Sequence, residues 1–144
     1  MNPPSWVLDT NVIVSGVLNP HGYPGRLVDA IIAGTLRLTL DDRILTEYRE
    51  VLARPKFGIP RAELEAVLSL FLRQDGVTPQ PLTTDLPDPE DLPFLEAAQL
   101  ATDKTLVTGN AKHLPKPKRR GATILSPAQA WQKLCSQRPP PEGG

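Results

Sequence analysis

The chain has 144 residues and a single cysteine, so it is long enough for one domain with a substantial core and cannot form an internal disulfide. A reducing, cytoplasmic compartment is therefore expected, and the apolar stretches are too short to predict a membrane span. The 16 acidic and 16 basic residues cancel, but they are unevenly spread: residues 75–103 hold seven acids and no base, whereas residues 104–141 hold eight bases and no acid. The two blocks are either differently charged surfaces or an acidic metal-binding cleft flanked by cations that hold a polyanion.

The first half of the chain reads as strand, helix, loop, helix and strand. An apolar run that ends at an acid predicts a short buried strand, and helical spacing of apolar residues follows it twice before the next alternating segment. The expected elements are a strand at Ser5–Leu8, a helix at Asn11–Leu18, a loop at 19–25, a helix at Arg26–Ala33 and a strand at Leu36–Leu40.

The second half continues the alternation. Apolar residues at helical spacing predict a helix at Arg43–Arg54 and another from Arg61, whose buried face would include Phe71 and Leu72. The remaining expected elements are a strand at 76–78, a helix from Pro89 to about Thr102, strands at Lys104–Thr108 and Thr123–Leu125, and a helix from Pro127 to about Leu134. Residues 1–135 would form the domain and residues 136–144 a disordered tail.

Alternating strands and helices predict an α/β protein with three layers, α/β/α, around a mostly parallel sheet of four to five strands. The first strand ends in Asp9-Thr10-Asn11, and the fourth ends in Thr108-Gly109-Asn110. Ligands of open α/β sheets bind beyond the carboxyl ends of strands, so these two turns would face one crevice if their strands are neighbours.

Four acids are candidates for that crevice, and each has an ordinary alternative role. Asp9 and Asp88 could each cap the following helix. Glu47 could pair with an arginine of its own helix, either Arg43 or Arg54. Asp91 could complete a capping box, but its spacing with Leu95 and Ala98 places it on the core side of its helix.

The donor types in this set indicate a hard metal ion. Carboxylate and amide oxygens suit Mg²⁺ or Mn²⁺, which bind substrate phosphates and activate water for phosphodiester hydrolysis. Asn110 is by itself a common turn residue. His113 has no second His or Cys at ligand spacing, so a zinc site is not expected.

Four motifs in this order resemble the PIN-domain ribonucleases, especially the small bacterial toxin-like subgroup related to VapC. The resemblance spans about Trp6 to Leu134. The motifs are Val7-Leu8-Asp9-Thr10-Asn11-Val12, residues 44–52 around Glu47, Asp88-Pro89-Glu90-Asp91 before residues 94–98, and Leu106-Val107-Thr108-Gly109-Asn110 before residues 112–115.

The resemblance implies that Asp9, Glu47 and Asp91 bind one Mg²⁺ or Mn²⁺ and carry out catalysis. Asp88 would be an auxiliary acid, and Thr10, Asn11 and Thr108 would orient the acids or hold substrate. The family's fourth acid is replaced here by Asn110, so a second metal site has less support. In-line attack on RNA would leave a 5′-phosphate and a 3′-hydroxyl.

The resemblance also implies partners. RNA would be held by the basic residues after the fourth turn, which otherwise form an ordinary solvated loop: Lys112, His113, Lys116, Lys118, Arg119 and Arg120. A toxin would need an antitoxin protein, and the chain would form a homodimer for which the Phe71–Leu72 helix is a candidate surface. Two alternatives stay open: a non-catalytic PIN-fold module that binds RNA or protein, and a phosphatase of the haloacid dehalogenase type. The phosphatase would need an acid where this chain has Asn11.

Overall fold

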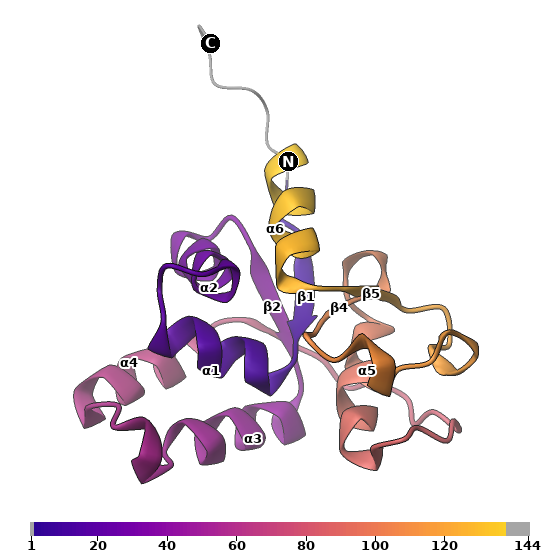
Figure 1. Ribbon diagram of the computed structural model, residues 1–144, viewed down its shortest axis with the longest axis horizontal. Coiled ribbons are helices and arrows are strands. Elements are labelled where there is room, and N and C mark those ends of the chain that lie inside the picture. Colours follow the sequence, from indigo (N-terminus) through magenta and orange to yellow (C-terminus); the bar gives the residue numbers. More distant parts are fainter. Residues whose placement is uncertain (1, 138–144) are drawn as a thin grey trace, which may run out of the picture.

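The computed structural model describes residues 2–137 of the chain, which form one parallel sheet flanked by helices (Figure 1). The strands are β1 (Ser5–Leu8), β2 (Arg37–Leu40), β3 (Asp75–Gly76), β4 (Thr105–Val107) and β5 (Thr123–Leu125). The α-helices are α1 (Thr10–Leu18), α2 (Tyr23–Ala33), α3 (Asp42–Leu52), α4 (Arg61–Leu72), α5 (Leu92–Ala98) and α6 (Pro127–Ser136). The predicted α/β/α class and the five-stranded parallel sheet are confirmed.

The sheet has the strand order β3-β2-β1-β4-β5, and every neighbouring pair is parallel. The chain moves outward from β1 to β2 and β3, then returns to place β4 on the other side of β1. This reversal of strand order lies between β1 and β4, where Leu8 pairs with Val107. The turns after these two strands therefore open into the same crevice, as predicted.

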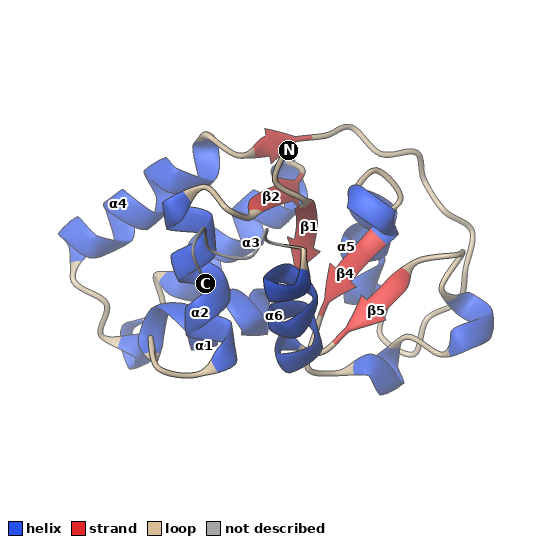
Figure 2. Ribbon diagram, turned by 90° about the horizontal axis from the view of Figure 1, so that it is seen from above, coloured by secondary structure: helices blue, strands red, loops and turns tan. Residues whose placement is uncertain are grey.

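Helices cover both faces of the sheet, and the core lies between these layers. Figure 2 shows α6 in front of the sheet and α5 behind it. The central strand β1 is almost entirely apolar, and its residues Trp6, Val7 and Leu8 are fully buried. A strand that is covered on both faces needs such a continuous apolar run, because neither set of its side chains meets water. Within residues 2–137, no helix has the length and apolar character needed to cross a membrane.

Helix α2 begins at Tyr23, three residues before the predicted start. Pro24 occupies the first turn, where its missing N–H costs nothing, so this turn-rich segment begins a helix and does not remain a loop. Gly25 is required there because a methyl group on its Cα would lie 2.5 Å from the Pro20 carbonyl. The predicted turn does form, but it covers only residues 20–21, before Gly22.

The helix predicted from Pro89 to Thr102 was too long. A 3-10 turn covers Pro89–Asp91, and α5 proper runs only from Leu92 to Ala98. Pro93 explains the break, because it has no N–H to donate to the carbonyl of Pro89 four residues earlier. After Ala98 the chain tightens through bonds such as that from the Leu100 N–H to the Ala97 carbonyl, and the helix ends.

Helix α4 buries Phe71 but not Leu72. Phe71 is 2% exposed and its ring packs 5.2 Å from that of Tyr48, whereas Leu72 is 66% exposed. The prediction that both residues form the buried face was therefore wrong for Leu72, and Phe71 belongs to the core and not to a surface available for dimerisation. Helix α6 extends to Ser136, just inside the predicted tail, and residues 138–144 of that tail lie outside the described residues.

We expect Gly25→Ala to lower the free energy of unfolding by about 1–3 kcal/mol, because overpacking against backbone atoms outweighs the usual helix preference for alanine. Urea denaturation measures the change. Gly76→Ala is the matched control, since no atom lies within 4 Å of the added methyl group, and its effect should stay within about 0.5 kcal/mol. Equal stabilities for the two variants would contradict the close approach of Gly25 to Pro20.

Candidate active site

Asp9 stands at the junction of β1 and α1, directly beyond the carboxyl end of the central strand. Its backbone N–H donates to the Val107 carbonyl at 2.9 Å, which extends the pairing with β4 by one residue. Its side chain does not cap α1, so the capping role is excluded. Instead the carboxylate accepts a hydrogen bond of 2.9 Å from the Thr108 hydroxyl. Burial raises the pKa of Asp9, and the Thr108 hydrogen bond offsets part of that rise.

Glu47 comes to the same place from α3. Its carboxylate accepts a hydrogen bond from the Thr10 hydroxyl, and neither Arg43 nor Arg54 forms an ion pair with it, so the alternative of a simple intrahelical pair is wrong. The next residue, Tyr48, is fully buried and donates its hydroxyl proton to the Leu8 carbonyl. Burial, together with the nearby Asp9 and Glu47 carboxylates, raises the Tyr48 pKa well above its usual range, so the phenol keeps that proton.

Asp91 ends the 3-10 turn that precedes α5, and Asp88 lies directly before that turn. Asp88 does act as a cap, because its carboxylate accepts a 2.9 Å hydrogen bond from the Glu90 backbone N–H. Asp91 does not complete a capping box. One of its oxygens, Oδ2, is buried and accepts no hydrogen bond from any of residues 2–137. The imidazole Nδ1 of His113 lies 3.6 Å from that oxygen.

These side chains line one cavity of about 210 Å³. The carboxyl groups in its wall come from three separate parts of the chain: Asp9, Glu47, Asp88, Glu90 and Asp91. Thr10, Asn11 and Asn110 also face it, so the structure brings the predicted acids and most of the predicted auxiliary residues together. Burial, followed by repulsion from Asp9 and Asp88, raises the pKa of Asp91 to about 6.

The donor set of this cavity fits a divalent cation. Asp88, Asp91 and His113 each offer one ligand atom, and these atoms lie within 4.8 Å of one another. The unpartnered oxygen of Asp91 belongs to this group, and a cation would satisfy it. Asp9 and Glu47 line the same cavity outside this tight group, each held by a threonine hydroxyl. Their role as metal ligands stays a prediction.

His113 is the one predicted RNA-binding residue that lines the cavity. It lies in a short 3-10 turn (Ala111–His113) after β4, and its backbone N–H donates to the Asn110 carbonyl at 2.9 Å. Sequence spacing gave no sign of this placement, because its acidic neighbours come from a distant segment. Among the other basic residues, Arg119 is engaged within its own loop, where it donates to the Leu114 carbonyl at 2.6 Å. The segment that contains His113 also carries three exposed basic side chains, those of Lys112, Lys116 and Arg120.

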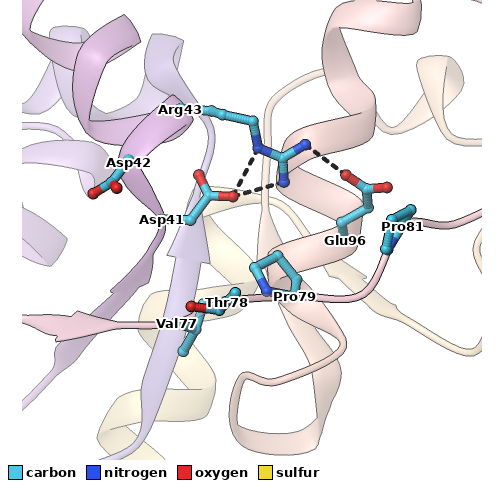
Figure 3. Close-up of a pocket in the computed structure, with 8 residues that line it drawn as sticks. All are labelled: Asp41, Asp42, Arg43, Val77, Thr78, Pro79, Pro81 and Glu96. Carbon is cyan, nitrogen blue, oxygen red and sulfur yellow. Dashed lines mark hydrogen bonds and ion pairs between the residues drawn. The ribbon is translucent and has the colours of Figure 1, made fainter.

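An ion pair that the sequence did not reveal joins α3 to α5. Glu96 is buried, and its carboxylate accepts hydrogen bonds of 2.7 Å from both the Arg43 guanidinium and the Leu82 backbone N–H. Arg43 also binds Asp41, as Figure 3 shows. Arg43 lies one helical turn before Glu47, and Glu96 lies five residues after Asp91. The pair therefore holds α3, which carries Glu47, against α5, which directly follows the turn that carries Asp91.

A family comparison agrees with this arrangement. The family model described as PIN domain matches residues 5–112, three quarters of the chain. The chain belongs to the PIN-domain family. The match covers β1, the helix that carries Glu47, the turn that carries Asp91 and the turn after β4. Searches of curated proteins and of solved structures gave no significant match, so no named relative assigns this PIN domain to a subgroup.

We expect Asp91→Asn to make this PIN domain more stable at about pH 7 when a chelator removes metal. The pKa of Asp91 is raised from 3.8 to about 6, so its penalty on folding is absent below about pH 4 and grows as the pH rises to about 6. After allowance for partial solvent screening, the gain is about 1–2 kcal/mol. Thermal denaturation across this range measures it, and a gain that is the same at all pH values would contradict the assigned cause.

We expect Glu96→Gln to lower the free energy of unfolding by about 1–3 kcal/mol, because Arg43 and the Leu82 N–H donate to different oxygens of Glu96 and glutamine replaces one of them with an NH₂ group that cannot accept. Glu65→Gln is the matched control. It removes an exposed pair with Arg61, in which the side chains are 91% and 65% exposed, and should change stability by less than about 0.5 kcal/mol. Urea denaturation of both variants tests the difference, and equal costs would show that the buried pair has no special role.

Proposed function

We propose that this PIN domain is a divalent-metal-dependent ribonuclease that hydrolyses RNA phosphodiester bonds. The observation that carries the proposal is the convergence of Asp9, Glu47 and Asp91 on one cavity. These acids come from the end of β1, the middle of α3 and the turn before α5. Carboxylates from three separate elements in one cavity repel one another, which costs stability unless a cation binds among them.

Mg²⁺ and Mn²⁺ are the ions that this cavity suits best. Asp9, Glu47 and Asp91 would hold the ion, with Asp88 as an auxiliary acid and Asn110 as a neutral rim group. Oxygen ligands suit both ions, while an imidazole ligand from His113 is better accepted by Mn²⁺ than by Mg²⁺. When bound, such an ion supplies an activated water and stabilises the leaving oxygen of a phosphodiester.

The residues around the acids hold them in place for this chemistry. The Thr108 hydroxyl fixes the orientation of Asp9, and its oxygen accepts a 3.1 Å hydrogen bond from the Asn110 N–H. The Thr10 hydroxyl fixes Glu47 in the same way. Asn11 is exposed at the cavity and is available to donate hydrogen bonds to a substrate. Preorganised neighbours of this kind reduce the reorganisation needed when the ion and substrate bind.

RNA is the substrate that the charge distribution favours. The basic side chains of residues 112–120 begin directly beside His113 and would hold the negative backbone near the cavity. A toxin of a toxin–antitoxin pair is the biological role we infer for a PIN ribonuclease of this size, with an antitoxin protein as its inhibitor. A neighbouring open reading frame for a small DNA-binding protein would support that role. We also propose that the chain forms a homodimer and acts in the cytoplasm.

The central test is cleavage of single-stranded RNA with Mn²⁺ or Mg²⁺. The wild-type chain should cleave, whereas Asp9→Asn and Asp91→Asn should lose at least about a hundredfold in rate, because each removes a charged ligand. Asp29→Asn is the matched control, an exposed acid on α2 away from the cavity, and should cleave like the wild type.

Two results would contradict the proposal. Equal cleavage by the wild type and Asp9→Asn would indicate a contaminating nuclease or another active site. Absence of cleavage in the wild type with either metal, together with retained RNA binding, would favour the non-catalytic binding module for which Asn110 is an argument.

A further inference from the structure

Arg54 is the one arginine or lysine among the described residues that line the acidic cavity. It follows the last turn of α3, and Glu47, Val51 and Arg54 recur at spacings of four and three residues, so they share one face of that segment. Five carboxyl groups line the same cavity. Arg54 nevertheless forms no ion pair or side-chain hydrogen bond with any of residues 2–137.

Arg43 provides a contrast, because its guanidinium is already held by two carboxylates. Arg43 lies four residues before Glu47 and is the arginine that helical spacing would pair with it. Asp41 and Glu96 hold the Arg43 guanidinium at 2.6 and 2.7 Å, turned away from Glu47. Arg43 is thus used by the scaffold, while the five guanidinium donors of Arg54, just beyond the end of α3, remain available at the cavity.

We propose that Arg54 binds a backbone phosphate of single-stranded RNA and so positions the strand across the acidic cavity. This inference rests on the proposed ribonuclease function. A phosphate that enters a wall of five carboxylates meets like charge, and a guanidinium in that wall offsets the repulsion at one point. Arginine also fits this task better than lysine, because its planar fork makes two parallel hydrogen bonds to a phosphate.

Arg54 and the basic residues 112–120 together define a path for the RNA across the cavity. Figure 1 shows α3 and the segment after β4 on different sides of the carboxyl end of β1. Arg54 follows the end of α3, whereas His113 and the basic residues 112–120 follow β4. A strand held at both places passes over the carboxylates that lie between them. One phosphate bound by Arg54 and others by the basic segment would therefore place an intervening phosphodiester at Asp9 and Asp91.

The test compares Arg54→Gln, Arg54→Lys and Arg49→Gln. Arg49 is the matched control, since it is exposed on α3, five residues before Arg54, and is not part of the cavity wall. Binding of a labelled single-stranded RNA oligonucleotide is measured by fluorescence anisotropy over a range of salt, in the Asp9→Asn background so that no cleavage occurs. Steady-state cleavage of the same RNA is measured with Asp9 intact, over a range of Mn²⁺ concentrations.

Arg54→Gln should weaken RNA binding about tenfold and reduce the slope of log affinity against log salt by about 0.7, the value for one lost phosphate contact on a single strand. Arg54→Lys should recover part of both effects, and Arg49→Gln should change neither. The Mn²⁺ concentration for half-maximal cleavage should not rise in Arg54→Gln, because removing a cation does not weaken a cation site. A purely structural role for Arg54 would raise it by disturbing the ligands.

Failure of this inference and failure of the ribonuclease function give different results. Cleavage by the wild type with the same RNA affinity and salt slope in Arg54→Gln and Arg49→Gln would overturn the role of Arg54 alone. Weaker RNA binding by Arg54→Gln in a chain that never cleaves would overturn the ribonuclease function and leave the phosphate contact supported. A higher Mn²⁺ requirement in Arg54→Gln would overturn the phosphate contact and indicate a structural role for Arg54.

Discussion

Repulsion among the carboxylates beyond the carboxyl end of β1 is the constraint that the surrounding structure has to meet. Like charges in a partly buried cavity favour separation or protonation, and for Asp91 burial first, and repulsion from Asp9 and Asp88 second, raise the pKa to about 6. The chain holds the acids in place with neutral donors, since Thr108 binds Asp9 and Thr10 binds Glu47. Neutral donors orient a carboxylate without cancelling its charge, so the acids stay available to a cation.

The same constraint explains how the arginines and the buried ion pair are arranged. An arginine paired with Glu47 would lower the repulsion, but it would also occupy the position that a cation needs. Arg43 instead joins α3 to α5 through Glu96, outside the cavity and next to the segment that contains Leu82. That pair thereby holds α3, which carries Glu47, against the helix that follows Asp91, while Tyr48 ties α3 to the last residue of β1. These contacts hold the elements around the cavity in place without using any carboxylate of its wall.

The parts of this arrangement that depend on local pattern could be predicted, and those that depend on distant partners could not. Apolar runs and their spacing predicted a mostly parallel sheet of four to five strands, because burial of a strand on both faces requires such a run. The acids at strand and helix ends could be recognised because a charge beside an apolar run is conspicuous. Helix spacing is a local signal and made Arg43 a possible partner of Glu47. The partner that Arg43 binds, Glu96, lies 53 residues away. Pro93 is a local signal too, and it explains why α5 begins at Leu92 and not at the predicted Pro89.

The zero net charge of the chain bears on how a polyanion would reach this cavity. With 16 acidic and 16 basic residues, the protein exerts little net attraction at long range, and screening at physiological salt confines any attraction to about 8 Å from a charged group. Association then depends on where the cations stand. The basic residues 112–120 lie next to His113, and Arg54 lies within the cavity wall itself, so positive charge is concentrated at the two sides of an acidic centre. Under the function we propose, such a local alternation would attract a phosphate backbone along one path, so the placement of charge, and not its total, would determine RNA binding.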